Sequence, residues 1–382
     1  MGLTIINYLF REAEQEKKIT KPIKSLAKNE LNETALLKIP PRPHKKLITS
    51  IQLLKDGRIA SSGLDGILNI YKKGTFKIEI KITVQSGIHS FSQLFDGRIV
   101  ICTDSTMNII KLLDNNKYEI EDKITANKYG DTIKVFGIKK DEFISIHQPL
   151  FNKLKSLILW KLNRKNKYEC ISTIKDTRIY NFLKINKKEF VTSQQEEIMS
   201  TSRYVHNEYL KFYNINNFKC IETLYNISIV RTHTHIDRSI FFENMIMLNK
   251  NILCVAGDYY IYIIDISKHK KIKTIYNKDF DGEYLNIFKF KNYLITNIKT
   301  IQDSKKDKKI KQKKILIYKY DNNFTDKDNI KIELYKIQDI EYNFTFCFQF
   351  NNNILITNDI NSINSFDGIK FNFINLNEFS IN

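Results

Sequence analysis

Hydrophobic and polar residues alternate with period two through most of the chain, and short turn motifs interrupt the alternation. The clearest example is segment 47–73, where three such runs are separated by Asp56-Gly57 and Asp65-Gly66. Asp-Gly between alternating runs is a strong β-hairpin signal. Residues 76–82 add a fourth alternating run. The pattern therefore predicts a sheet of four antiparallel strands.

The same pattern recurs along the chain. The run Phe95-Asp96-Gly97-Arg98-Ile99-Val100 matches residues 55–60, and further units are expected at 132–174, 177–225, 240–277, 284–338 and 343–376. Residues 170–174, 220–224 and 271–275 superimpose without a gap as fourth strands. A large or aliphatic residue ends each expected third strand: Tyr71, Ile110, Trp160, Tyr213, Ile264, Tyr318 and Phe366, at spacings of 39, 50, 53, 51, 54 and 48. Repetition at such intervals predicts one repeat domain.

Two stretches resemble the WD40-repeat family. Residues 61–71 are similar to its second strand, turn and third strand, and Leu159-Trp160-Lys161-Leu162 resembles its Trp-Asp dipeptide with Lys in place of Asp. His44 and His89 lie near the place of its Gly-His motif, but intact Gly-His and Trp-Asp are missing. The resemblance covers residues 47–376. It implies an all-β fold, a seven-bladed β-propeller of four-stranded antiparallel blades, whose His, Asp, Ser/Thr and Trp hydrogen-bond network is incomplete in most blades.

The resemblance also suggests a domain organisation. Residues 33–382 are expected to form the propeller, and residues 1–32 a short helical or disordered N-terminal extension. The apolar run 35–39 precedes a Pro-rich stop and is placed to close the ring by pairing with the seventh unit. Residues 369–376 are the alternative outer strand of that unit.

The chain is strongly basic, with a formal charge of +19 from 61 Lys and Arg residues against 42 Asp and Glu. Such a charge favours an anionic partner such as nucleic acid. However, only nine of the basic residues are Arg, the better residue for bidentate phosphate recognition. Abundant Lys, Asn and Ile also match A/T-rich codons, so genome composition is a competing cause of the charge.

Two insertions interrupt the repeats, at residues 194–207 and 302–314, and both are expected to be surface loops. The second holds the candidate partner-binding residues Lys305, Lys306, Lys308, Lys309, Lys311, Lys313 and Lys314. A lysine run of this kind suits an acidic protein surface, an RNA contact or a nuclear-localisation signal. It also suits a solvated excursion, because like charges repel and extend such segments. The run has no interleaved aromatic residue for base stacking, which disfavours RNA.

One stretch carries the residue types of a metal site. On a strand, His233, His235 and Asp237 would point the same way, as in part of the metallo-β-lactamase signature. Arg238 replaces a further ligand, and no matching distant ligands are evident, so no metal is expected. The sequence also lacks a P-loop, a GxGxxG motif and a nucleophile elbow. We therefore expect no catalytic residue, no cofactor and no enzymatic activity.

Cysteine usage and hydropathy bear on the compartment of the protein. Cys102, Cys170, Cys220, Cys254 and Cys347 form no CxxC pair and lie in apolar strand patterns, so reduced, buried thiols are expected. No apolar run approaches the ~18 residues of a membrane span. These features predict an intracellular, cytoplasmic protein, with the nucleus as the alternative compartment.

The function expected is a scaffold or adaptor subunit that binds one or more proteins. RNA binding, and a propeller enzyme or ligand-binding domain, are the less favoured alternatives.

Overall fold

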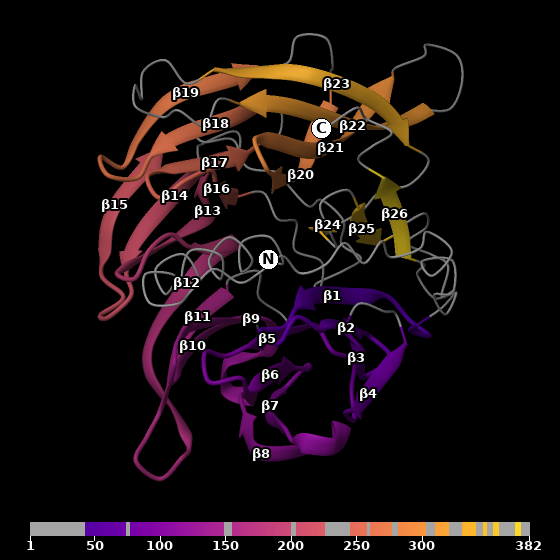
Figure 1. The fold of residues 1–382 in the computed structure, drawn as a ribbon. Coiled ribbons are helices and arrows are strands. Elements are labelled where there is room, and N and C mark those ends of the chain that lie inside the picture. The colour runs from indigo at the N-terminus through magenta and orange to yellow at the C-terminus, as the bar shows by residue number, and fades with distance from the viewer. Residues whose placement is uncertain are drawn as a thin grey trace, which may run out of the picture. The chain divides into compact units, whose positions relative to one another are not determined.

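The structure, a computed structural model, describes residues 43–73, 77–148, 155–199, 204–225, 245–257, 260–276, 282–302, 310–320, 331–340, 347–349, 354–358 and 371–375. Strands dominate these residues, and they follow the expected repeats in chain order (Figure 1). The extension 1–32, the run 35–39 and the His233, His235 and Asp237 stretch lie outside the described residues.

The first two repeats each form a four-stranded antiparallel sheet whose strand order follows the chain. The strands of the first are β1 Ile48–Leu53, β2 Ile59–Gly63, β3 Ile67–Tyr71 and β4 Ile78–Thr83. Those of the second are β5 Ser90–Gln93, β6 Ile99–Cys102, β7 Thr106–Leu112 and β8 Tyr118–Thr125, with the short 3-10 helices η1 Asp114–Asn116 and η2 Asn127–Tyr129.

The third and fourth repeats share a strand. Their sheet runs in the order β15-β14-β13-β12-β11-β10-β9. Strand β12 is 17 residues long; its first part is the outer strand of the third repeat, and its last part, Arg178 to Lys184, pairs with β13 as the first strand of the fourth. The strands are β9 Asp131–Lys139, β10 Glu142–Gln148, β11 Lys155–Leu162, β12 Tyr168–Lys184, β13 Glu189–Met199, β14 Tyr204–Asn214 and β15 Cys220–Tyr225.

The fifth and sixth repeats are again four-stranded, and the seventh has three described strands. They are β16 Met245–Met247, β17 Ile252–Ala256, β18 Tyr260–Asp265, β19 Lys270–Tyr276, β20 Gly282–Phe290, β21 Tyr293–Gln302, β22 Ile310–Tyr320, β23 Ile332–Ile340, β24 Cys347–Gln349, β25 Ile354–Asn358 and β26 Phe371–Asn375.

The last strand corrects the expected layout of the seventh repeat. Strand β26 hydrogen-bonds to β25, so it takes the third position and not the outer one. Phe366, expected to end the third strand, lies outside the described residues. Among the described strands nothing takes the outer position of this sheet. Closure of the ring by residues 35–39 therefore stays a prediction.

A shared irregularity confirms the alignment of the repeats. In five sheets the pairing of the third and fourth strands shifts at the residue that the sequence pattern aligned: Tyr71, Ile110, Tyr213, Ile264 and Tyr318. Each shift places one extra residue on the fourth strand, as in a β-bulge, which bends the strand and increases its twist.

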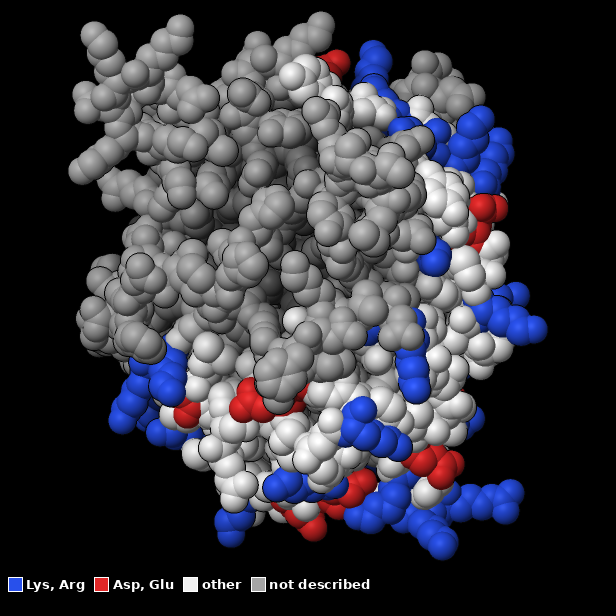
Figure 2. Space-filling view, turned by 180° about the vertical axis from the view of Figure 1, so that it is seen from behind, with Lys and Arg blue, Asp and Glu red and all other residues white. Residues whose placement is uncertain are grey.

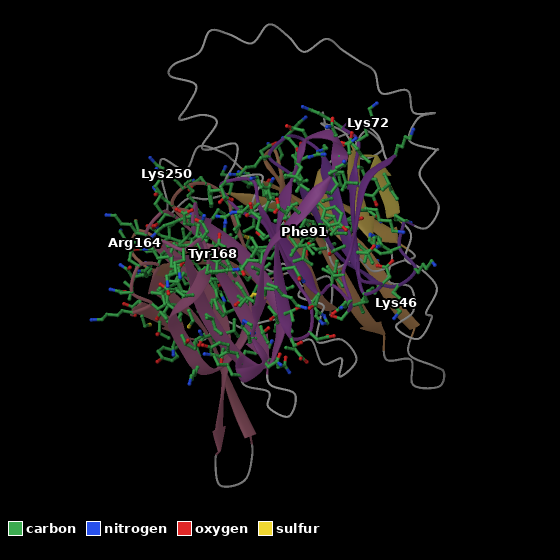
Figure 3. All side chains as sticks on the ribbon, turned by 90° about the horizontal axis from the view of Figure 1, so that it is seen from below. Lys46, Lys72, Phe91, Arg164, Tyr168 and Lys250 are labelled. Carbon is green, nitrogen blue, oxygen red and sulfur yellow. The ribbon has the colours of Figure 1, made fainter. Side chains whose placement is uncertain are left out.

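The insertion at 194–207 is not a loop. Strands β13 and β14 pair residue by residue from Glu189 opposite Asn214 to Met199 opposite Tyr204, so only residues 200–203 separate them. The expectation was wrong because two arms of equal length can satisfy each other's backbone hydrogen bonds as one long hairpin. Figure 3 shows this hairpin as a two-stranded arm that projects at the lower end of the view.

The chain divides into two compact units. One holds Met1–Ser145, Trp160–Glu169 and Ser365–Phe371, and the other holds Ile146–Leu159, Cys170–Asn364 and Asn372–Asn382. Each has a core built between neighbouring repeats. In the first unit Leu68, Ile82, Phe91 and Ile101 belong to one buried cluster that joins the first and second repeats. In the second unit Leu210, Phe212, Leu253 and Tyr262 belong to a cluster that joins the fourth and fifth. Apolar burial between facing sheets is thus the main stabilising contribution within each unit.

Candidate functional site

The first repeat contains a complete chain of buried polar side chains. The Tyr71 hydroxyl lies 2.8 Å from the Ser61 hydroxyl, which lies 2.8 Å from His44 Nε2, and His44 Nδ1 lies 3.1 Å from Asp65 Oδ1. In the neutral tautomer that donates from Nδ1 to the carboxylate, each group has its partner. A Cβ on Gly63 would lie 2.8 Å from His44 Nδ1, so only glycine fits there. Tyr71 holds the third-strand position that Trp160 holds in the third repeat.

The ionisable groups of this chain are shifted in the directions that burial and pairing dictate. Burial raises the pKa of Tyr71 to about 12. Burial also acts to raise the pKa of Asp65, but hydrogen bonds from His44 and from the Lys45 backbone amide outweigh it and hold that pKa below its ordinary value. The anionic carboxylate is therefore the form that stabilises the folded repeat.

Elsewhere the network is reduced, as the resemblance implied. His89 and Asp104 make only the first link in the second repeat, 2.6 Å apart. Trp160 Nε1 donates to Ser145 at 2.7 Å in the third repeat. In the fourth repeat the Gln194 amide donates both to Thr192 and to the Tyr213 hydroxyl, at 2.6 Å and 3.0 Å.

Two aligned positions, one on the second strand and one at the end of the third, change together from repeat to repeat. Cross-strand register places Ser61, Ile101, Thr192, Val255 and Thr296 at one second-strand position. Where that position carries a hydroxyl, the aligned third-strand residue is Tyr; where it is Ile or Val, the partner is Ile. The rule is physical, because a buried hydroxyl without a partner costs about 1–3 kcal/mol.

Ion pairs tie the turns of the first three repeats. The Arg58 guanidinium lies 2.7 Å from Asp56 and 3.0 Å from Glu79. Arg98 pairs with Asp96 and Glu121, and its guanidinium lies 5.3 Å from the centre of the Tyr168 ring. The guanidinium groups of Arg58 and Arg98 are thus each matched by nearby acids. Figure 2 accordingly shows red and blue side chains intermixed at its lower edge.

Exposed large apolar side chains gather on outer strands. Among the described residues they are Ile120 on β8, Ile171 on β12, Ile221 and Tyr225 on β15, Tyr276 on β19 and Leu334 on β23, with Leu113 in the turn before β8. Tyr225 and Tyr276 are the most exposed, at 60% and 52%. Each is paired with a tyrosine on the neighbouring strand, Tyr209 or Tyr260, with ring centroids 5.9 Å and 5.3 Å apart. We did not predict the exposure of Tyr225 and Tyr276 from sequence, although the two tyrosines occupy the same position of successive repeats.

The predicted lysine segment is divided by the structure. Ile310–Tyr320 forms β22, which pairs with β21 as far as Ile310 opposite Gln302, so Lys311, Lys313 and Lys314 are strand residues. The expected loop 302–314 was therefore too long, because the hairpin extends further than its polar composition indicated. Lys305, Lys306, Lys308 and Lys309 lie outside the described residues.

The cysteines divide by position. Cys102 and Cys254 are buried, as expected, and burial raises the pKa of both thiols. Cys170 is half-buried and Cys220 is exposed, so the expectation of burial was wrong for these two. Both lie on the outermost strand of a repeat, where one edge faces solvent. Cys347 begins β24.

Within the described residues there is no group of three or more His, Cys, Asp and Glu side chains that could hold a metal ion. No helix in the part of the chain that the structure describes is long and apolar enough to cross a membrane.

Solved structures share this architecture. The C-terminal WD40 domain of Sif2 aligns with 85% of this chain and 80% of its own, at a TM-score of 0.54 and 10% identity. The β-propeller domain of Cps50 (Swd1) from Myceliophteria thermophila aligns with 88% of this chain and 99% of its own, at a TM-score of 0.58 and 9% identity. No protein-family model and no curated protein matches the sequence. Likeness at this level of identity concerns the fold.

Proposed function

The chain folds as a WD40-type β-propeller, and we propose that it is a non-enzymatic interaction platform, a subunit that binds other proteins through its outer strands and turns. Rigid scaffolds commonly carry binding residues on their connecting segments. One observation carries the proposal: the exposed large apolar side chains of the described residues lie on outer strands or in the turn before one, above a buried core. Apolar groups in such a position mark interaction surfaces when they are grouped.

Tyr225 and Tyr276 are the proposed anchors. Aromatic side chains are enriched among interface residues whose truncation costs most, because they bury a large area with little loss of side-chain entropy. Tilted ring contacts with Tyr209 and Tyr260 restrict the positions of both rings before a partner arrives. Lys211 lies 5.0 Å from the centre of the Tyr209 ring, which places a cation beside the first of these anchors.

The experiment is partner capture from the native cell with a double variant, Tyr225→Thr and Tyr276→Thr. We expect recovery of the protein partner to fall about tenfold, equivalent to ~1.4 kcal/mol of binding free energy. The matched control is Glu119→Thr with Lys123→Thr, which changes two exposed side chains of the second repeat outside the apolar set and should leave recovery unchanged. Thermal unfolding of both proteins should stay near the wild type, because exposed positions contribute little to stability. Equal recovery with both variants would contradict the assignment of the anchors.

The lysine segment supplies a second, salt-sensitive contribution to the same function. Neutralising Lys305, Lys306, Lys308 and Lys309 should weaken capture of an acidic partner, most at low ionic strength, because exposed charges are screened over about 8 Å in physiological salt. Unchanged recovery would remove these residues from the proposal. RNA as the principal crosslinked species would favour a nucleic-acid function instead.

A further inference from the structure

Exposed lysines recur on the turns of the fourth and fifth repeats. Five lie in the turns between first and second strands or between third and fourth, and the sixth begins β19: Lys187, Lys188, Lys219, Lys250 and Lys268, with Lys270, which we call the basic turn surface. Because the chain reverses at every turn of such a sheet, these two turns lie at the same end of each repeat. Backbone hydrogen bonds join them: Ile215 donates to Lys188 at 2.7 Å, and Ile266 donates to Asn251 at 2.9 Å.

Contacts between repeats hold the turns in a fixed arrangement. His269, in the last turn of the fifth repeat, lies 3.6 Å from the Glu189 carboxylate and has its ring centroid 4.5 Å from that of Phe212, both in the fourth repeat. The Lys289 ammonium of the sixth repeat donates to the Leu248 carbonyl of the fifth at 2.6 Å. All of these residues belong to the same compact unit. A surface fixed before binding loses less entropy when a partner arrives.

Among the described residues, few acidic groups lie near this surface. Asp265 is the sole acidic residue in the described part of the fifth repeat, and it is buried, with its Oδ1 accepting from the Ser267 amide and hydroxyl at 2.9 Å and 2.7 Å. Glu189 is held beside His269. In the second repeat, by contrast, the equivalent turn carries the exposed Asp114 near Lys117, and in the third repeat the Lys167 ammonium lies 2.8 Å from Asp122. Genome composition raises lysine content everywhere, whereas the lack of an exposed acid in the described part of the fifth repeat is local to that repeat.

The chemistry of the surface narrows the class of partner that it could bind. Its six members are all lysines, which act as point charges without the planar fork with which Arg reads phosphate. The exposed rings Tyr225 and Tyr276 end β15 and β19, whereas the basic turns precede those strands, so described exposed aromatics for base stacking lie at the opposite end. The large apolar residues of these turns, such as Ile215, Leu248 and Ile266, are buried, so none can insert into a bilayer.

From the proposed protein-binding function and these observations, we infer that the basic turn surface binds an extended protein segment rich in Asp and Glu. The lysines attract the segment and the linked turns hold them in position. In Figure 3 Lys250 lies at the upper end of its unit and the β13–β14 arm at the lower end, so this surface is distinct from the arm.

The test uses the full chain and a fluorescently labelled peptide of alternating Glu and Gly, measured by fluorescence anisotropy. In one variant Lys188, Lys219, Lys250 and Lys268 are changed to Gln. In the control Lys117, Lys123, Lys140 and Lys165, which are also exposed, are changed to Gln. Net charge changes equally in both. We expect the first variant to bind about tenfold more weakly, with a shallower salt dependence, and the control to stay within about twofold, since only the first loses direct charge contacts.

Four results would overturn the inference. Equal weakening in both variants would show that net charge alone attracts the peptide. Tighter binding of oligouridine, or of phosphatidylserine vesicles, than of the peptide would assign the surface to RNA or to a membrane. Failure of the peptide to bind, with capture of the native partner still dependent on Tyr225 and Tyr276, would reject this surface while leaving the interaction platform intact. Loss of both would reject the two proposals together.

Discussion

The first and fifth repeats build the same four-stranded sheet with different chemistry. The first joins its strands through His44, Ser61, Asp65 and Tyr71, whereas the fifth has Val255 and Ile264 at the corresponding strand positions. Charge follows the same division among the described residues. Their Arg ion pairs lie in the first three repeats, and the exposed lysines of the fifth have no exposed acid in the described part of that repeat. Apolar packing thus holds both repeats, and the first adds a buried polar network that the fifth lacks at these positions.

The largest expected effect on stability is in the fifth repeat. Leu253→Ala removes a fully buried side chain from the core shared by the fourth and fifth repeats. We expect a loss of about 2–5 kcal/mol, because the missing contacts leave a cavity that no polar network offsets. Chemical denaturation measures the change. Ile221→Ala, at an exposed position of the neighbouring repeat, is the control and should alter stability by about 0.5 kcal/mol or less. Similar values for both would refute packing as the source of stability.

Breaking the polar network should cost less. His44→Ala removes the imidazole that hydrogen-bonds to both the Ser61 hydroxyl and the Asp65 carboxylate. We expect the free energy of unfolding to fall by about 1–3 kcal/mol. His89→Ala removes the lone His-Asp link of the second repeat, whose Asp104 is exposed, and should cost about 0–1 kcal/mol. Equal losses would mean that the first network is no stronger than an isolated surface pair.

The network also predicts a pH dependence. Asp65 has a pKa below its ordinary value in the folded chain, so its contribution is present above the unfolded pKa of about 3.9 and is lost as the pH falls through the folded value. The free energies of unfolding of the wild type and of Asp65→Asn should therefore differ above about pH 4 and converge as the pH falls below it. A constant difference between them across this range would contradict the assignment.

The smallest effect is expected for the ion pairs of the first repeats. Arg58→Gln removes contacts to Asp56 and Glu79 near the surface and should cost about 0.2–1 kcal/mol, less at high salt. Thermal unfolding at low and high ionic strength tests it. A larger loss that salt does not change would indicate a packing role for the side chain.

Much of the fold could be predicted from the sequence because it depends on local signals. Period-two alternation and Asp-Gly turns placed the strands, and the aligned Tyr71, Ile110, Tyr213, Ile264 and Tyr318 coincide with the bulges. The arm formed by β13 and β14 was missed because polar residues such as Gln194 and Gln195 weaken the alternation, and only pairing with a second arm makes them strand residues.

The candidate sites were harder to predict. The conspicuous lysine run is consecutive in sequence, whereas Lys188, Lys250 and Lys268 lie on separate turns that only the fold relates. The inward position of Asp265, which leaves these lysines unmatched, likewise depends on its buried hydrogen bonds. A repeat-by-repeat comparison of turn residues would have been the signal for them.

Lysine footprinting of the complex isolated from the native cell tests the account most directly. Acetylation followed by mass spectrometry compares each lysine in the free and the partner-bound chain. The account predicts protection of Lys188, Lys219, Lys250 and Lys268 by a protein partner, with Lys117, Lys123 and Lys140 labelled equally in both states. Equal labelling at both sets of lysines, or a complex that contains no second protein, would contradict it.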